Sequence, residues 1–382
     1  MVTTSEASSN GEVVDILLIG LGSIGSVYAY MLEKSGRVRV TAVARSNYDL
    51  YTKSGVTLDT DRFGKITGWR PYRVVKTQAE ALEGNVHYAL CMICTKCLPD
   101  VLPTPTLVGD LIHSGKIGAW ALLQNGLGVE EDLYQAVKHL DTPIISNCIW
   151  IGVMTNPDGS IVSWKGQDAM VAGIYPPKKP MQEEQTRVFS AKESGVLDLW
   201  VDALTAGEAK IKVDERIDGV RFSKNVWNCV WSSIQGLTRA TPNYFAHHSA
   251  AEQAPLRAFI REIVETGFRA GLLREGMPLY PAGTPMGSSA EVQRAAWDSI
   301  VNMSLEKAKQ GIPPHRMSLL IDVEMGRPFE LEVITGAVAK VAKSHGYETP
   351  FLDFTYSLLK GVQNNIIDAQ KKKNGGSFVP PA

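Results

Sequence analysis

The stretch VVDILLIGLGSIG, residues 13–25, sets the topology of the first half of the chain. Its apolar run predicts a buried strand, and the glycines that follow are spaced Gly-x-Gly-x-x-Gly. In a strand–turn–helix unit, the first glycine allows a tight turn, the second lets a pyrophosphate approach the backbone, and the third lets helix and strand pack. The helix N-terminus adds amide donors. The alternative is a turn that binds nothing. The residues that we expect to contact a dinucleotide here are Gly20, Gly22, Ser23, Ile24 and Gly25.

The end of the second expected strand indicates which dinucleotide binds. Arg45 lies there, twenty residues after Gly25, and Ser46 follows it. An NAD site carries a carboxylate at this place for the ribose hydroxyls, whereas an NADP site carries a cation for the 2′-phosphate. Arg45 therefore favours NADPH as the cofactor. An arginine that is merely exposed at a strand end is the alternative.

Short apolar runs alternate with helical patterns over the first half of the chain. This alternation predicts right-handed crossovers and a doubly wound parallel sheet of the Rossmann type. The expected strands are Val13–Ile19, Val38–Val43, His87–Ile93, Ala119–Leu123 and Pro143–Ile149. The expected helices are Ser23–Ser35, Pro99–Ser114 and Val129–His139. The turn signal Asn156–Gly159 indicates an antiparallel edge within Ile151–Gly173.

Long helical patterns replace the strands after about Lys212. We therefore predict an α/β dinucleotide-binding domain at 13–213, an all-helical substrate domain at 214–370, and flexible tails at 1–12 and 371–382. The expected helices are Gly219–Leu237, Ala251–Glu275, Ala290–Gln310, Pro328–His345 and Pro350–Gln370.

Composition excludes several classes of function. The chain of 382 residues has 39 basic and 40 acidic residues and a net charge of −1, so it has no general attraction for nucleic acid or an anionic membrane. Its apolar runs are shorter than the roughly 20 residues of a membrane span. Met1–Glu12 is polar and lacks the apolar core of a signal peptide. An odd count of five cysteines argues against a disulfide framework, so we expect a cytoplasmic protein.

The cysteines at 91, 94 and 97 have the spacing of part of an iron–sulfur motif. They fall at the end of a predicted buried strand, where cysteine behaves as a small hydrophobe. Strand alternation points Cys91 and Cys94 to opposite faces, and a fourth cysteine is distant in sequence. We therefore predict no metal site.

The helical pattern Gly219–Leu237 carries a polar stripe of Lys224, Asn228 and Ser232 at successive turns. Such a stripe is typical of any amphipathic helix that faces water. Asparagine is a poor helix former, however, and a Lys–Asn pair beside Trp227 and Trp231 suits a half-buried cleft better. From the pattern alone, both interpretations stay open.

Taken together, the motifs from about Val14 to Gln370 resemble the ketopantoate reductase family, the 2-dehydropantoate 2-reductases. The matching segments, in chain order, are Gly20–Gly25 with Arg45, Thr95-Lys96, Leu123–Gly128, Lys224-x3-Asn228, Ser318–Asp322 and Glu330. The resemblance implies a Rossmann domain followed by a helical domain, and reduction of a small 2-oxo acid by NADPH.

The resemblance also implies a role for each matching residue. Lys224 is expected to be the general acid that protonates the nascent alkoxide, and burial would lower its pKa. Glu330 is expected to accept from a substrate hydroxyl and to balance Lys224, although a glutamate just behind Pro328 is also an ordinary helix start. The remaining expected contacts are Asn228, Ser232 and Ser318 for the substrate, and Lys96 and Asn125 for the cofactor.

One departure from the family pattern concerns the substrate. The family has asparagine where this chain has Ser232, which is shorter and offers fewer hydrogen bonds. The cleft would then hold a bulkier or different oxo acid, lined by Trp227, Trp231 or His315. We therefore keep two alternatives open: a tailoring reductase for a larger ketone, and a non-catalytic NADP-binding regulator. A homodimer is also left open.

Overall fold

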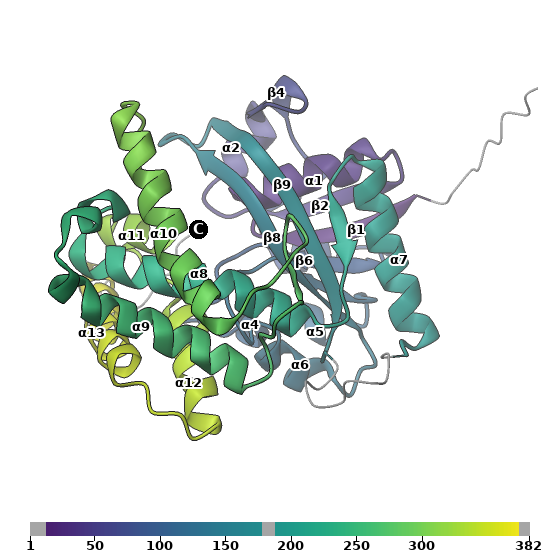
Figure 1. Cartoon of the computed structure of the whole chain (residues 1–382). Coiled ribbons are helices and arrows are strands. Elements are labelled where there is room, and N and C mark those ends of the chain that lie inside the picture. Colours follow the sequence, from purple (N-terminus) through teal and green to yellow (C-terminus); the bar gives the residue numbers. More distant parts are fainter. Residues whose placement is uncertain (1–12, 178–187, 374–382) are drawn as a thin grey trace, which may run out of the picture.

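The computed structural model describes residues 13–177 and 188–373. A ten-stranded sheet forms the first part of the chain, and a group of helices packs beside it (Figure 1). The strand order is β4-β3-β9-β8-β7-β6-β1-β2-β5, with β10 paired to β9. The strands are β1 Val14–Ile19, β2 Val38–Val43, β3 Val56–Thr60, β4 Gly64–Trp69, β5 Arg73–Val75, β6 Leu90–Ile93, β7 Trp120–Leu122, β8 Ile144–Thr155, β9 Ile161–Tyr175 and β10 Ile211–Val213.

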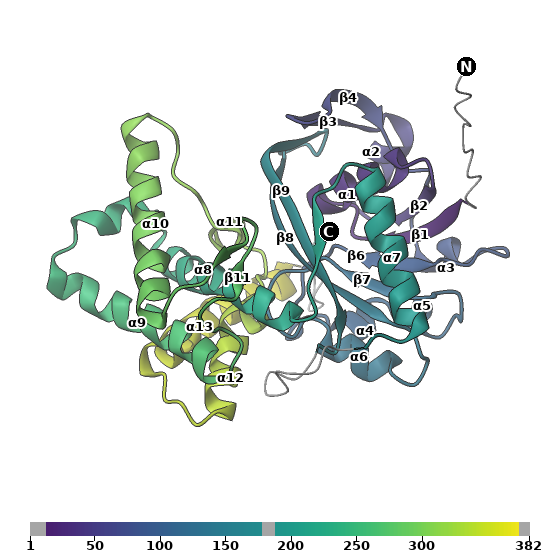
Figure 2. The ribbon, with the colours of Figure 1, turned by 45° about the vertical axis from the view of Figure 1, so that its right-hand side comes forward.

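Helices cover both faces of this sheet, as a doubly wound fold requires (Figure 2). Alternate residues of β1 point to opposite faces, so that Leu18 joins the core under α1 and α7 while Leu17 joins the core beside α5 and α6. The helices of this part are α1 Ser23–Lys34, α2 Tyr48–Lys53, α3 Gln78–Ala81, α4 Thr104–Leu107, α5 Gly109–Ile112, α6 Glu131–Val137 and α7 Ala191–Ala206.

The five predicted strands form the parallel series β2-β1-β6-β7-β8, so the expected fold class is confirmed. The sheet as a whole is mixed. β8 and β9 form an antiparallel hairpin around the predicted turn, but the expectation that this hairpin is the edge was wrong. β3 and β4 lie beyond it, and we did not expect them because β4 is too polar to show a strand pattern.

Two predicted helices differ from their prediction in the structure. Pro99–Ser114 contains only the four-residue helices α4 and α5. Pro103 and Pro105 lack amide donors, so the helix does not extend before Thr104, and Val108 separates α4 from α5. Pro328–His345 begins with non-helical residues, passes through a π-helical turn at Glu332–Gly336 (η2), and ends as α12 at Ala337–Ser344.

The helical part is built around α8, Ile217–Thr238, which packs against its neighbours on several sides (Figure 1). The other elements are η1 Pro242–His247, α9 Ala250–Arg269, α10 Ser289–Lys309, α11 Ser318–Glu324, α13 Pro350–Lys373 and a small hairpin of β11 Pro278–Leu279 and β12 Thr284–Pro285. Residues 371–373 continue α13 beyond the predicted helix end at Gln370. The rest of both predicted tails lies outside the described residues. The domain boundary at 213/214 stays a prediction. None of the described helices is long and apolar enough to cross a membrane.

Candidate active site

The glycine turn after β1 is packed at its ends and open in the middle. Gly20 has a φ of +99°, and a Cβ there would lie 2.8 Å from the backbone nitrogen of Thr95. A Cβ on Gly25 would lie 2.2 Å from the Gly20 carbonyl oxygen. Gly22, the N-cap of α1, has no atom within 4 Å of its Cβ position. The turn therefore leaves open the side from which a phosphate can approach the helix amides.

A cleft of about 370 Å³ opens at the carboxyl ends of β1, β2 and β6. The expected cofactor contacts that line it are Gly20, Gly22, Ser23, Arg45 and Lys96. Ile24 and Gly25, which we also expected to contact the cofactor, do not line the cleft. Ile24 packs against the sheet core and Gly25 is buried inside α1, so both support the glycine turn on its core side. The Thr95 hydroxyl is buried at this cleft and has no hydrogen-bond partner within the described chain. An open helix end, a cation beyond the second strand and an unpaired hydroxyl together suit a dinucleotide.

Lys96 is tied to the helical part of the molecule. Its ammonium pairs with the buried carboxylate of Asp322 on α11. Arg327 lies on the other side of the same carboxylate, with Nη2 3.1 Å from Oδ1, and also lines the cleft. Both parts of the chain therefore contribute charge to the cleft.

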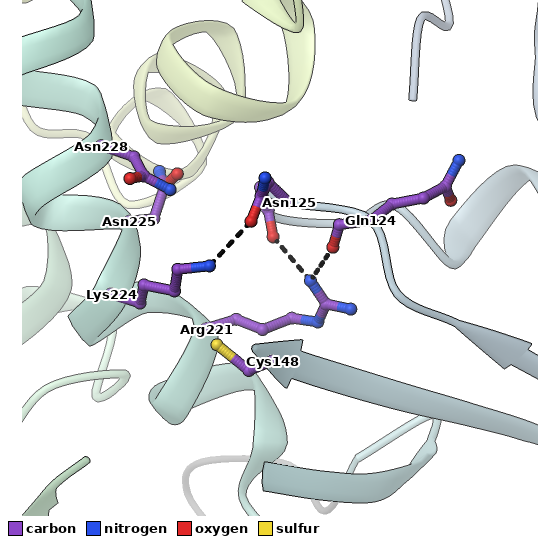
Figure 3. Close-up of a pocket in the computed structure, with 8 residues that line it drawn as sticks. Gln124, Asn125, Cys148, Arg221, Lys224, Asn225 and Asn228 are labelled. Carbon is purple, nitrogen blue, oxygen red and sulfur yellow. Dashed lines mark hydrogen bonds between the residues drawn. The ribbon is translucent and has the colours of Figure 1, made fainter. Parts of the chain in front are cut away.

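A second, small pocket holds Lys224 where α8 meets the carboxyl edge of the sheet (Figure 3). Its Nζ donates to Asn125 Oδ1 at 2.7 Å and to the Ile149 carbonyl oxygen at 2.5 Å. Asn228, one turn further along α8, lines the same pocket. The start of the polar stripe therefore faces the sheet, and the interpretation of this part as a water-facing helix surface was wrong.

Burial governs the charge of Lys224. Its pKa lies below the ordinary value for lysine, mainly because burial disfavours the ammonium form. The neighbouring Arg221 charge acts in the same direction, whereas Glu330 opposes it. A lysine in this environment gives up its proton more readily than one in water.

Glu330 is buried at the junction of the two parts. Its Oε1 accepts from the backbone nitrogen of Cys97 at 3.2 Å. Burial raises its pKa to about 7, although the charges of Lys96 and Lys224 act to lower it. Among the described residues Glu330 forms no ion pair within 4 Å with Lys224, so the two interact through space. Glu330 is thus a buried junction residue, not merely an exposed helix-start charge.

The remaining expected substrate residues lie further from Lys224 along the chain. Ser232 is buried on α8, and its hydroxyl has no hydrogen-bond partner in the described chain. Ser318 is exposed at the start of α11. Trp227 is half-buried and lies 6.3 Å from the His315 ring, between ring centroids. Trp231 is fully buried and donates to the Ala296 carbonyl oxygen, so the expectation that it lines a cleft was wrong.

Arg221, which was not predicted from the sequence, joins α8 to the sheet. Its buried guanidinium lies 2.8 Å from the Glu130 carboxylate, and it donates to the carbonyl oxygens of Gln124 and Gly126 at 2.9 and 3.1 Å (Figure 3). The signal available was its position three residues before Lys224, which places both on one helix face. The Gln124 side chain, also missed, is buried at this pocket with both polar atoms unpaired in the described chain.

The cysteines lie as strand alternation predicts. Cys91 joins the core on one face of the sheet, and Cys94 packs against the core on the other. Burial raises the pKa of both thiols. Within 13–177 and 188–373, no group of three or more His, Cys, Asp or Glu side chains could hold a metal ion. The absence of a metal stays a prediction.

Family models match both halves of the chain. The family described as "Ketopantoate reductase PanE/ApbA" matches residues 16–177, and "Ketopantoate reductase PanE/ApbA C terminal" matches residues 216–363. The chain belongs to the ketopantoate reductase family. It is accordingly an oxidoreductase of the class that acts on CH–OH groups.

Individual relatives and solved structures match this chain at low identity over most of their length. An uncharacterised protein of Saccharomyces cerevisiae is 24% identical and covers 92% of this chain and 94% of its own. The 2-dehydropantoate 2-reductase of Pyrococcus abyssi is 22% identical, with 91% and 97% covered. The crystal structure of the Methylococcus capsulatus 2-dehydropantoate 2-reductase has a TM-score of 0.69 at 23% identity, with 92% and 98% covered. The structure of D-mandelate dehydrogenase with NADH and anilino(oxo)acetate has a TM-score of 0.67 at 16% identity, and the match covers 92% of this chain and 99% of that one.

Proposed function

We propose that this chain reduces a small 2-oxo acid with NADPH, and that 2-dehydropantoate, which yields pantoate, is the leading substrate. The observation that carries the proposal is the half-buried Lys224, held against Asn125 where α8 meets the carboxyl edge of the sheet. In open α/β sheets, ligands bind at this edge. A proton donor is therefore present where a dinucleotide and a carbonyl would meet.

The cofactor contacts follow from the geometry of the cleft. The open backbone at Gly22 and Ser23 suits the pyrophosphate, and the Arg45 guanidinium with Ser46 suits a 2′-phosphate, which favours NADPH over NADH. Asn125 would contact the nicotinamide end. NADPH supplies the hydride that reaches the carbonyl carbon.

The protein residues polarise the carbonyl and supply the proton. Lys224 would donate a hydrogen bond to the carbonyl oxygen and then transfer its proton as that oxygen becomes an alkoxide. Its positive charge would also attract the substrate carboxylate. Asn228 would orient the substrate from the next turn of α8, and Glu330 would accept from a substrate hydroxyl. Substrate contacts by Ser232 and Ser318 complete this proposal.

A steady-state assay of the purified chain against a panel of 2-oxo acids, with NADPH and then with NADH, tests the proposal. We expect turnover of at least one 2-oxo acid, with 2-dehydropantoate foremost, and tighter binding of NADPH. If no 2-oxo acid in the panel supports NADPH oxidation, the proposed function is contradicted. Equal affinity for both cofactors would contradict the role of Arg45.

A larger ketone is the second candidate substrate. Ser232 is shorter than the family's asparagine and offers fewer hydrogen bonds, and its buried hydroxyl has no partner in the described chain, which favours a different substrate. Higher kcat/KM on a larger ketone than on any small 2-oxo acid would favour this candidate. A regulator without activity is disfavoured because a cofactor sensor needs no buried proton donor. We also propose a homodimer, which light scattering would test.

A further inference from the structure

Asp322 holds two cations from different parts of the molecule. Lys96 follows β6 of the sheet, and Arg327 follows α11 of the helical part. Each pairs with one oxygen of the Asp322 carboxylate, which is almost completely buried. Two positive charges thus share one negative charge at the wall of the dinucleotide cleft, and Arg327 and Lys96 both line that cleft. Glu330 is the other carboxyl that interacts with Lys96, and its pKa of about 7 leaves it partly neutral at physiological pH.

Arg327 has donors that its pairing with Asp322 leaves unused. A guanidinium carries five N–H donors, and the contact to Asp322 is made through Nη2. The Nε atom is buried and has no hydrogen-bond partner within residues 13–177 and 188–373. A buried polar group without a partner is costly, so the protein alone does not satisfy this guanidinium. The Arg327 side chain is 37% exposed and lines the cleft, so its remaining donors can reach a ligand there.

The position of this cation pair is fixed by the sheet. β1 and β6 are neighbouring parallel strands, and the Cys94 amide donates to the Ile19 carbonyl oxygen at 2.9 Å where both strands end. The Gly20 turn is in close contact with Thr95, the residue before Lys96. Lys96 and Arg327 therefore lie near the N-terminus of α1, where a pyrophosphate binds in this type of fold.

We propose that Arg327 binds the cofactor pyrophosphate from the helical side of the cleft, opposite the amides of the glycine turn. This inference rests on the proposed use of a dinucleotide. It gives the helical part a direct contact with the cofactor, in addition to its proposed contacts with the substrate. An arginine fork suits two phosphate oxygens, and Asp322 orients it. The competing interpretation is that Arg327 only neutralises Asp322.

The test is the affinity of the purified full chain for NADPH, NADH and 2′-AMP, measured by calorimetry without any 2-oxo acid. Arg327→Ala should weaken the binding of NADPH and of NADH by the same factor, about tenfold to a hundredfold, because both cofactors carry the pyrophosphate. Its affinity for 2′-AMP, which lacks a pyrophosphate, should not change. Arg45→Ala should give the opposite pattern: the binding of NADPH and 2′-AMP should weaken, and the binding of NADH should not change. Arg327→Lys should recover part of the loss, since it keeps the charge but not the fork.

Arg316→Ala is the matched control, because Arg316 pairs with Glu324 at the surface of the same segment and does not line the cleft. It should bind all three ligands as the wild type does. Unchanged NADPH and NADH affinity in both Arg327 variants, or a loss confined to NADPH, would overturn the inference while leaving the proposed function intact. A wild type that binds no dinucleotide would overturn both. A wild type that binds through Arg327 but reduces no 2-oxo acid would overturn only the proposed function.

Discussion

At the scale of single residues, the proposed mechanism depends on the surroundings of the Lys224 amine. We predict that Lys224→Ala lowers kcat on the best 2-oxo acid by roughly 10²–10⁴, because the proton donor is lost. KM should rise as well, since the charge that attracts the substrate carboxylate is gone. Lys224→Arg should not restore the rate, because a guanidinium gives up its proton far less readily.

Lys309→Ala is the control for this substitution, because Lys309 is an exposed lysine that pairs with Glu306 at the end of α10. It should keep wild-type kinetics. A loss smaller than about tenfold in kcat/KM for Lys224→Ala, or about 1.4 kcal/mol, would mean that another group donates the proton.

Glu330 should make both activity and stability depend on pH near neutrality. Burial raises its pKa to about 7, so the folded chain holds this proton more tightly than the unfolded chain does. The stability that this carboxyl contributes is therefore present below its unfolded value of 4.5 and falls as pH rises toward 7. If the ionised form accepts from the substrate, kcat/KM should fall as pH drops below 7.

Glu330→Gln separates these effects. The variant should lose the acidic limb of the kcat/KM profile at a lower overall rate, and its Tm advantage over the wild type should be larger at pH 8 than at pH 5. A profile with the same limb near pH 7 in both proteins would assign that limb to another group.

The residues of the site were only partly foreseeable from sequence. Helical spacing placed Lys224 and Asn228 on one face of a predicted helix, although spacing alone did not distinguish a cleft from a water-facing surface. The sequence around Glu330 has the pattern of an ordinary helix start. Its burial could not be predicted, because it depends on contact with the distant Cys97 backbone. Arg221 was missed because its partners lie in the other part of the chain, where no local pattern points to them.

At the scale of elements, the π turn η2 supports the Asn125 loop. The Leu127 amide donates to the Val333 carbonyl oxygen at 2.7 Å, and Gly126 has a φ of +101° with that same oxygen 2.6 Å from its Cβ position. We predict that Gly126→Ala displaces Asn125 from Lys224. Because displacements of about 1 Å can cost 10²-fold, kcat/KM should fall by at least tenfold.

Gly128→Ala is a matched control for this loop. Gly128 also has a positive φ, +65°, but no atom lies within 4 Å of its Cβ position. Both variants carry backbone strain, so both should lose some stability. Only Gly126→Ala should lose activity strongly; equal activity in the two would show that the contact with η2 does not position Asn125.

The contact between α8 and the sheet depends on the Arg221–Glu130 pair. Arg221→Met leaves the Glu130 carboxylate buried without its cation, so unfolding free energy should fall by about 3–5 kcal/mol. Adding Glu130→Gln should recover part of this loss, because the double variant buries no unpaired charge. Chemical denaturation of the wild type, Arg221→Met, Glu130→Gln and the double variant measures this coupling. Additive losses would mean that the pair is not an energetic unit.

Strong periodicity made most elements predictable, and its absence explains the failures. α1 and the strands of the parallel series have apolar runs that are sharply bounded by glycine or polar residues. β4 is polar and largely exposed, and β3 is a short strand of five residues whose pairing with β9 depends on tertiary contact. The π turn depends on contact with the Asn125 loop and on the Asn225 side chain, which donates to the Ile334 carbonyl oxygen at 2.9 Å.

At the scale of the whole molecule, the two parts together complete the site. The sheet provides the glycine turn and Asn125 of the candidate site, and the helical part provides Lys224 and Arg327, with Glu330 buried at the junction. The sequence predicted two kinds of structure in the right order. It did not predict that α8 would meet the carboxyl edge of the sheet, because that contact depends on tertiary packing of residues nearly a hundred positions apart.

The most direct test of the central claim is deuterium transfer from NADPH labelled at C4, in each stereochemical position, to 2-dehydropantoate and other 2-oxo acids, read by mass spectrometry and NMR. We predict a 2-hydroxy acid that carries one deuterium on C2 from one of the two labelled forms and none from the other. No 2-hydroxy acid from any 2-oxo acid, or a product that carries no deuterium from either form, would contradict the account.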